Sequence, residues 1–176
     1  MFNPNQISIN VVGKDEYKEL QSIGRATFAQ TFVNDCASSD MQSYLEEQHS
    51  EKQIRSELEN PESKFYFARF EDKVIAYLKI NWGSAQTESK LEQAWEIERL
   101  YVLAEYQGMK IGRIFMDMAI EQAQSEKYKV VWLGVWENNI KAIRFYENYG
   151  FEVFDSHIFT IGTDHQTDLL MKLALK

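Results

Sequence analysis

Residues 107–113 read Gln-Gly-Met-Lys-Ile-Gly-Arg and connect a segment with a strand pattern to one with a helical pattern. Gly108 and Gly112 let the backbone turn tightly before the helix, which leaves N–H groups free in its first turn. Those groups and the helix dipole favour phosphate oxygens, and Lys110 and Arg113 add positive charge there. Because many ordinary turns also have two glycines before a helix, this stretch alone indicates a phosphate site only weakly.

The rest of the chain alternates between the strand and helix periods of hydrophobicity. Strands are expected at residues 7–12, 64–70, 73–82, 93–103, 129–135, 151–161 and 166–173. Helices are expected at residues 15–32, at 40–58, from 111 to about 122, and from a cap at Asn138 to about 149. This order predicts a single α/β domain over residues 1–176, with a mixed sheet of about seven strands and helices on both of its faces.

The strand before the loop has an irregular pattern. Glu96 and Glu98 lie on the side of the pleat opposite Ile97, but strict alternation would put Leu100 and Val102 with the glutamates. A β-bulge between the second glutamate and the leucine would re-aim these side chains, and bulges occur next to active sites. A strand covered on both faces needs no alternation at all, so both explanations stay open.

A second informative block follows about thirty residues after the loop. Residues 135–146 read Val-Trp-Glu-Asn-Asn-Ile-Lys-Ala-Ile-Arg-Phe-Tyr, and residues 96–102 read Glu-Ile-Glu-Arg-Leu-Tyr-Val. Together with the loop, these blocks resemble the GCN5-related N-acetyltransferase (GNAT) family. The matching positions are Gln107, Gly112, Asn139, Ala142, Phe145, Tyr146, Gly150 and Phe151. Lys110 replaces the middle glycine of the family loop, so that either the lysine contacts a phosphate or the loop is reshaped.

A closer resemblance is to the PaiA-type spermidine/spermine acetyltransferases. It covers nearly the whole chain, is strongest over residues 96–171, and includes Trp132-Leu-Gly-Val-Trp-Glu137, His157-x-Phe and Gln166-Thr-Asp-Leu-x-Met171. The resemblance implies the GNAT fold, a mostly antiparallel sheet with about four helices in which the fourth and fifth strands splay apart. It implies a polyamine substrate more weakly than it implies the fold.

The resemblance also implies roles for individual residues. An acetyl group would pass directly from acetyl-CoA to a small cationic amine, without a metal. The cofactor-binding residues would be Leu100, Tyr101, Val102, Gln107, Gly108, Met109, Lys110, Ile111, Gly112, Arg113, Asn139 and Tyr146. Tyr146 would also be the general acid that protonates the leaving thiolate, although a tyrosine on an apolar helix face is more often a core residue.

The general base is harder to assign. A polyamine nitrogen with a pKa of ~10.4 must lose a proton before it attacks, which costs roughly 4.6 kcal/mol at pH 7. Some relatives carry a glutamate on the later strand, where this chain has Gly134. Glu98 is the predicted catalytic base and Glu96 is the alternative, and either residue could instead be solvated or simply attract the cationic substrate.

Composition limits the function further. The 176 residues carry a net charge of −8, which argues against nucleic acid and anionic membranes as partners. The acidity fits a cationic substrate, but it equally fits solubility alone. Cys36 has no partner for an intrachain disulfide, and His49, His157 and His165 lack metal-ligand spacing. With no signal peptide or membrane segment in the sequence, we expect a cytoplasmic protein, either monomer or homodimer.

Three functions remain open. The first is polyamine N-acetylation with acetyl-CoA. The second is acetylation of another amine, such as a protein N-terminus, a lysine or a small drug. The third is a non-catalytic acyl-CoA-binding regulator, against which the presence of Asn139 and Tyr146 argues.

Overall fold

Seven segments of alternating or apolar sequence form β-strands. These are β1 (Ile7–Val11), β2 (Ser63–Phe70), β3 (Lys73–Asn81), β4 (Ala94–Val102), β5 (Val130–Trp136), β6 (Glu152–Ile161) and β7 (Asp164–Ala174). In the computed structural model, which describes residues 6–32, 38–161 and 164–176, they form one sheet in the order β1-β2-β3-β4-β5-β7-β6. Neighbouring strands are antiparallel except for β4 and β5, which are parallel. The predicted mixed, mostly antiparallel sheet is confirmed.

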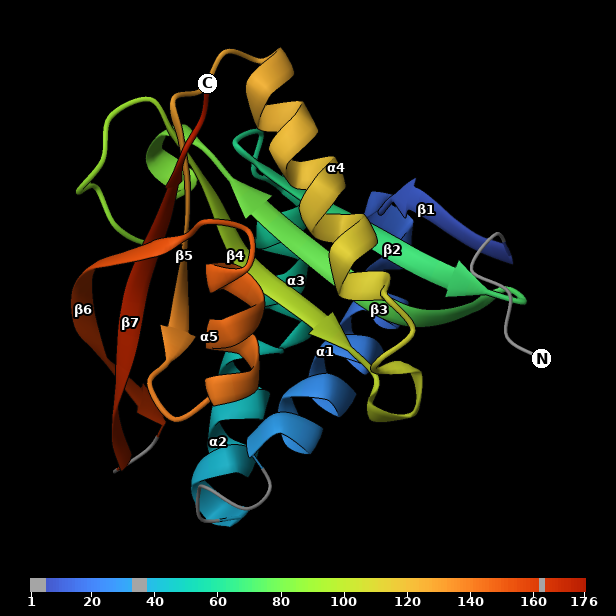
Figure 1. Cartoon of the computed structure of the whole chain (residues 1–176). Coiled ribbons are helices and arrows are strands. Elements are labelled where there is room, and N and C mark those ends of the chain that lie inside the picture. Colours follow the sequence, from blue (N-terminus) through green and yellow to red (C-terminus); the bar gives the residue numbers. More distant parts are fainter. Residues whose placement is uncertain (1–5, 33–37, 162–163) are drawn as a thin grey trace.

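Five α-helices lie in the described part of the chain: α1 (Tyr17–Phe32), α2 (Ser38–Gln48), α3 (Glu51–Glu59), α4 (Ile111–Ser125) and α5 (Ile140–Glu147). Figure 1 shows α4 and α5 on one face of the sheet and α1, α2 and α3 on the other. Short 3₁₀ turns span Lys14–Glu16, Gly83–Ala85 and Ala104–Tyr106. None of the helices formed by described residues has the length and apolar character needed to cross a bilayer.

Two predicted helix boundaries are wrong. The single helix expected over residues 40–58 is two helices, because Ser50 caps α3 by accepting a hydrogen bond from the backbone N–H of Gln53. The cap of α5 is Asn139 rather than Asn138, since its side-chain oxygen accepts from the Ala142 N–H at 3.2 Å. Cys36 lies outside the described residues.

The core is divided by the sheet. On one face, α4 buries Ile111, Phe115 and Met116 against the sheet, and α5 adds partly buried apolar side chains to this cluster. On the other face, α1 buries Leu20, Ile23 and Phe28, at the helical spacing expected from the sequence. Both layers therefore hold the middle strands of the sheet, β4 and β5, from opposite sides.

Candidate active site

The parallel strands β4 and β5 pair over only part of their length. Their register runs from Ala94 opposite Val130 to Ile97 opposite Leu133, and it ends there. Beyond this point residues 99–102 of β4 continue to pair with β3, and residues 134–136 of β5 continue to pair with β7. The backbone edges that face one another across the two diverging strands are thus left without strand partners, as the predicted splay requires.

A β-bulge at Glu98 coincides with this divergence. Lys79 of β3 pairs with Arg99, but the next pair is Ile80 with Ile97, so Glu98 is an extra residue in β4. Of the two explanations that the sequence leaves open for the irregular pattern, the structure shows the bulge. It returns Leu100 to the apolar cluster of Ile97 under α4, and it bends the strand where pairing with β5 stops.

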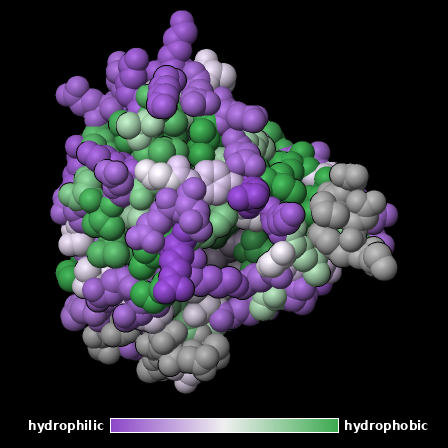
Figure 2. Space-filling model, viewed as in Figure 1, coloured by the Kyte–Doolittle hydropathy of each residue, from purple (hydrophilic) through white to green (hydrophobic). Residues whose placement is uncertain are grey.

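A cavity of about 820 Å³ occupies the opening between the two strands. Residues from β4, β5, α1, α2, α5, β6, β7 and the loop before α4 line it. A recess also opens near the middle of the face shown in Figure 2, and both hydrophilic and hydrophobic residues surround it. Every cofactor-binding residue predicted from the sequence lines the cavity except Met109. The lining members of that set are Leu100, Tyr101, Val102, Gln107, Gly108, Lys110, Ile111, Gly112, Arg113, Asn139 and Tyr146.

The loop before α4 ends at one mouth of the cavity. Gly108 has φ +82° and Lys110 has φ 64° and ψ 11°, so both are in the left-handed region. Lys110 therefore keeps a backbone conformation that suits the glycine it replaces, at a cost of about 1 kcal/mol. A Cβ at Gly108 would meet nothing within 4 Å, whereas one at Gly112 would contact Leu100 and Phe145 at 3.7 and 3.8 Å.

The loop is linked to both neighbouring elements. The Gln107 side-chain amide donates a hydrogen bond to the Val102 carbonyl at 3.3 Å, and Lys141 of α5 donates to the Gln107 side-chain oxygen at 3.1 Å. With Lys110 and Arg113, Lys141 is a third cation lining this mouth. Sequence analysis assigned no role to Lys141, although it lies two residues after Asn139 on the same helix as Tyr146.

Tyr146 reaches the cavity from α5. Its ring packs near Phe151, with ring centroids 6.0 Å apart, and it lines the cavity. Burial raises the pKa of Tyr146 to about 12. The phenol is therefore protonated throughout the neutral range and can donate a hydrogen bond into the cavity.

Glu98 belongs to a buried cluster of charges on the face of α1–α3. Its carboxylate lies 2.5 Å from the Lys79 ammonium and 3.1 Å from the Arg99 guanidinium, and it accepts a hydrogen bond from Asn81 at 2.6 Å. Glu57 of α3 completes the cluster with two 2.9 Å hydrogen bonds from Arg99. Burial acts to raise the pKa of Glu98, but the two cations outweigh it and lower the pKa to about 2.

Glu96, the alternative base, is also held by hydrogen bonds. It accepts from the Thr87 backbone N–H at 2.9 Å, from the Thr87 hydroxyl and from Asn81 at 3.0 Å. Burial raises its pKa, and these hydrogen bonds oppose the rise. Both glutamates line the cavity, and the contacts described above engage both carboxylates.

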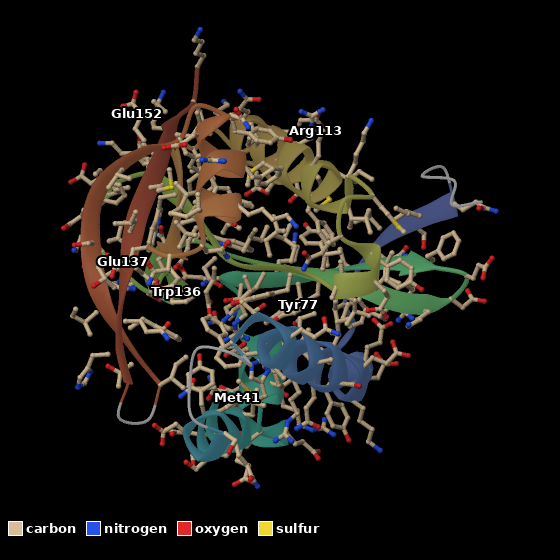
Figure 3. All side chains as sticks on the ribbon, turned by 60° about the horizontal axis from the view of Figure 1, so that its bottom comes forward. Met41, Tyr77, Arg113, Trp136, Glu137 and Glu152 are labelled. Carbon is tan, nitrogen blue, oxygen red and sulfur yellow. The ribbon has the colours of Figure 1, made fainter. Side chains whose placement is uncertain are left out.

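Aromatic rings enclose the part of the cavity toward α1 and α2. The rings of Phe28 and Tyr44 stack at 4.5 Å, Tyr44 meets Phe159 edge-on at 5.8 Å, and Phe32 lies 6.0 Å from Trp136. In Figure 3, Trp136 and Tyr77 lie on the side of the sheet toward α1, and Arg113 lies on α4 on the other side. The cavity thus joins a cationic mouth on one side of the sheet to an aromatic end on the other.

Comparison with known proteins decides the family. The sequence model of the acetyltransferase (GNAT) family matches residues 30–151. The chain belongs to the GNAT family. One GNAT relative is an uncharacterised N-acetyltransferase from the pepI 3′ region of Lactobacillus delbrueckii subsp. lactis, 37% identical over 96% of this chain and 98% of that protein. The spermine/spermidine N(1)-acetyltransferase of Bacillus subtilis is 33% identical, but over only 37% of this chain and 43% of its own length.

A solved structure shares the GNAT fold over nearly the whole chain. It is the PaiA N-acetyltransferase of Thermoplasma acidophilum in complex with coenzyme A, with a TM-score of 0.78 and 20% identity. The similarity covers 96% of this chain and 99% of that one. No group of three His, Cys, Asp or Glu side chains that could hold a metal ion occurs among the described residues of this GNAT chain.

Proposed function

We propose that this protein transfers the acetyl group of acetyl-CoA to a primary amine, and that the amine is a polyamine such as spermidine or spermine. One observation carries the proposal. A single cavity joins three features: the phosphate-type loop at the start of α4, the unpaired edges of β4 and β5, and the Tyr146 phenol. Family membership supports acetyl transfer, and the coenzyme A bound to the Thermoplasma protein supports the donor.

The residues fit an acyl-CoA. The first backbone N–H groups of α4 have no intrahelical acceptor and point toward the loop, where a pyrophosphate would gain from them and from the helix dipole. Lys110, Arg113 and Lys141 add cationic side chains at this mouth. The unpaired edge of β4 over residues 100–102 offers hydrogen bonds to the amides of the pantetheine arm, in the manner of an added strand.

The chain's own groups account for the chemistry of transfer. A neutral amine nitrogen bonds to the thioester carbon, and the carbon–sulfur bond breaks as the thiolate leaves. Backbone N–H groups of β4 stabilise the developing oxyanion. Tyr146 donates a hydrogen bond to the sulfur; because its pKa of about 12 exceeds the ~8.5 of a thiol, full proton transfer is uphill and the donor acts mainly by hydrogen bonding. The nitrogen loses two protons in all; one ends on the thiol and the other in solvent.

Glu98 fits a charge-holding role better than the predicted base role. A carboxylate with a pKa of about 2 is a weak proton acceptor at neutral pH, and Lys79, Arg99 and Asn81 engage it. We therefore propose that Glu98 stabilises the bulge and the charge cluster next to the aromatic end of the cavity, which we call the acceptor end. That Glu98 acts as base stays a prediction.

The acceptor end of the cavity supports a cationic amine. Stacked and edge-on aromatic rings bind ammonium groups through their faces, and Tyr44, Trp136 and Phe159 line this end together with Asp168. The spermine/spermidine N(1)-acetyltransferase of Bacillus subtilis, which is similar to part of this chain, supports the same substrate class. An aromatic and acidic end suits an elongated polycation better than an anionic or neutral acceptor.

The test is release of the coenzyme A thiol from acetyl-CoA by the purified protein with spermidine, spermine, a lysine peptide and an aminoglycoside in parallel. Binding of acetyl-CoA is measured separately by calorimetry. Thiol release with the polyamines at the highest kcat/KM supports the proposal. Faster thiol release with the peptide or the aminoglycoside would show that the substrate is another amine. Binding of acetyl-CoA without thiol release in the presence of any of these amines would contradict the proposal that the protein is an enzyme.

A further inference from the structure

Three neighbouring strands bring Trp136, Asp168 and His157 into one row on one face of the sheet. Asp168 of β7 pairs with Trp136 of β5 on one side and with His157 of β6 on the other. Directly paired residues of neighbouring strands project to the same face. Trp136 packs against Phe32 of α1, so this is the face that bears the aromatic end of the cavity. All three row members line the cavity.

The row continues through an ion-pair contact and a hydrogen bond to a third side chain. The Asp168 Oδ2 atom lies 3.6 Å from the His157 Nε2 atom, and the His157 Nδ1 atom lies 2.8 Å from the Glu88 Oε1 atom. Glu88 comes from the connection between β3 and β4. When the Nδ1 proton is donated to Glu88, the Nε2 lone pair faces Asp168, and this tautomer can accept a proton from the aspartate.

Gly134 leaves room for a ligand next to the Asp168 carboxylate. A Cβ built on this β5 residue would lie 3.7 Å from Asp168 Oδ2 and 3.6 Å from Leu170. Since glycine carries no side chain and Gly134 is exposed, a methyl-sized space next to the carboxylate is unfilled by β5, and both residues line the cavity. The carboxylate of Asp168 therefore borders the opening between β4 and β5, where the acetyl thioester would lie.

Three carboxylates line the acceptor end of the cavity, and they differ in how many side chains contact them. Glu98 is engaged by the side chains of Lys79, Arg99 and Asn81, and Glu96 by those of Thr87 and Asn81, so the oxygens of both already have partners. Among the described residues, the Asp168 carboxylate forms an ion pair with His157 alone. Its side chain is 18% exposed, about as much as that of Glu98 at 16%, so the two carboxylates differ in their partners rather than in their exposure.

We propose that Asp168 accepts the proton of the acceptor ammonium, and that His157 and Glu88 are positioning residues that orient it and pass the proton toward solvent. The inference rests on the proposed function and names the base within it. The ammonium N–H bond breaks, its electron pair stays on nitrogen for the attack, and the proton bonds to an Asp168 oxygen. The aspartate then gives it to His157 Nε2, and the imidazolium, held by Glu88, releases a proton to water.

The electrostatic surroundings of Asp168 suit a proton acceptor. Burial raises the pKa of the Asp168 carboxyl group, and the charge of His157 offsets part of this rise. The raised pKa makes the carboxylate a better proton acceptor at neutral pH. Other titratable groups near the chain are Tyr44 of α2, Glu88, and Asp155 of β6, which is paired with Lys90 at 2.6 Å. Lys90 is the one permanent cation in this group, and it is paired with Asp155. Asp168 therefore differs from Glu98, whose ionised form is stabilised by direct contact with Arg99.

The test is the pH profile of kcat/KM for spermidine with wild-type protein and Asp168→Asn. With a working base, wild-type kcat/KM should level off well below the amine pKa of ~10.4. Without it, the variant must use the rare free amine, so its kcat/KM should rise about tenfold for each pH unit. We expect Asp168→Asn to lose about 100-fold at pH 7 and less than 10-fold at pH 9.

Companion variants separate a base from a structural role. His157→Gln and Glu88→Gln should each lose about 10-fold at pH 7, again with a loss that shrinks as the pH rises. Asp155→Asn removes the same charge from the neighbouring strand without lining the cavity, and it should retain the wild-type profile. Thermal melts of all four variants identify any that are misfolded, and His157→Gln carries the test if Asp168→Asn is one of them.

The outcomes are distinct. A pH-dependent loss in Asp168→Asn and His157→Gln, absent in Asp155→Asn, supports the proposal. A loss of equal size at every pH assigns Asp168 to substrate binding or structure and overturns it, as does an unchanged profile in the folded variant. If the wild-type protein turns over no amine at all, the proposed function falls first and this inference falls with it.

Discussion

Lys110 combines backbone strain with a positive charge in the loop before α4. Its φ of 64° is a conformation in which a side chain costs about 1 kcal/mol relative to glycine. Its ammonium lines the cationic mouth of the cavity. Lys127, just after α4, has the same φ but lies outside the cavity lining. The two lysines therefore form a matched pair in which strain is common and location differs.

We expect Lys110→Gly to raise the melting temperature by roughly 2–4 °C, since relief of about 1 kcal/mol corresponds to that shift in a chain of this size. The same substitution should weaken acetyl-CoA binding several-fold through the lost charge. Lys127→Gly should give the thermal gain alone. Melting curves and calorimetric Kd values check both, and equal Kd changes in the two variants would show that Lys110 has no role in cofactor binding.

Tyr146 carries the second residue-scale prediction. Tyr146→Phe keeps the ring that packs near Phe151 and removes only the hydroxyl, so we expect an unchanged fold and acetyl-CoA affinity with kcat about 100-fold lower. Stopped-flow thiol release and calorimetry measure the two quantities. Turnover equal to that of the wild-type protein would refute the assignment of Tyr146 as the donor to the leaving sulfur.

At the scale of elements, the bulge in β4 and the charge cluster beneath it depend on one another. The bulge adds Glu98 to the strand on the same side as Arg99 and Lys79, and α3 brings Glu57 to the same cluster. The pKa of Glu98 in the folded protein is about 2, below its usual value of ~4.3. Because a lowered carboxyl pKa stabilises the fold above the unfolded pKa, this stability should be lost as the pH falls from about 4.5 toward 2.

Glu98→Gln should therefore destabilise the protein at pH 7 by about 3 kcal/mol, or roughly 6–12 °C, since two buried cations lose a carboxylate. The variant should also lose less further stability than wild type between pH 4.5 and 2. Melting temperatures across that pH range check the prediction. Glu51→Gln, which breaks an exposed pair with Arg55, is the control and should melt as wild type does; a Glu98→Gln curve that matches it would contradict the account.

The sequence alone predicts the order of the elements and the family motifs. It does not predict the break between α2 and α3, the residue that caps α5, or the register of β6 against β7. The break between α2 and α3 had a visible signal, because Ser50 stands three residues before Gln53 in a capping pattern. Asn138 and Asn139 are equivalent caps in sequence, and only packing chooses between them. Asp168 meets His157 because a bulge at Phe154 shifts the β6–β7 register by one residue, and no local pattern predicts that shift.

At the scale of the whole molecule, the protein is acidic, with a net charge of −8, although one mouth of its cavity is lined by cationic side chains. An acidic protein attracts a polycation over a distance of about one Debye length, ~10 Å at 0.1 M salt. We therefore expect kcat/KM for spermidine to fall more steeply between about 10 and 300 mM salt than kcat/KM for a monoamine of similar length. Initial rates over that range measure the two slopes, and parallel slopes would show that the acidity serves solubility alone.

The central claim is that acetyl-CoA occupies the opening where β4 and β5 part. A crystal structure of the protein with coenzyme A tests it most directly. The account predicts the pyrophosphate on residues 108–113, the pantetheine arm along residues 100–102 of β4, and the sulfur within hydrogen-bond reach of the Tyr146 hydroxyl. Coenzyme A bound elsewhere, or β4 and β5 paired along their full length with the cofactor excluded, would contradict it.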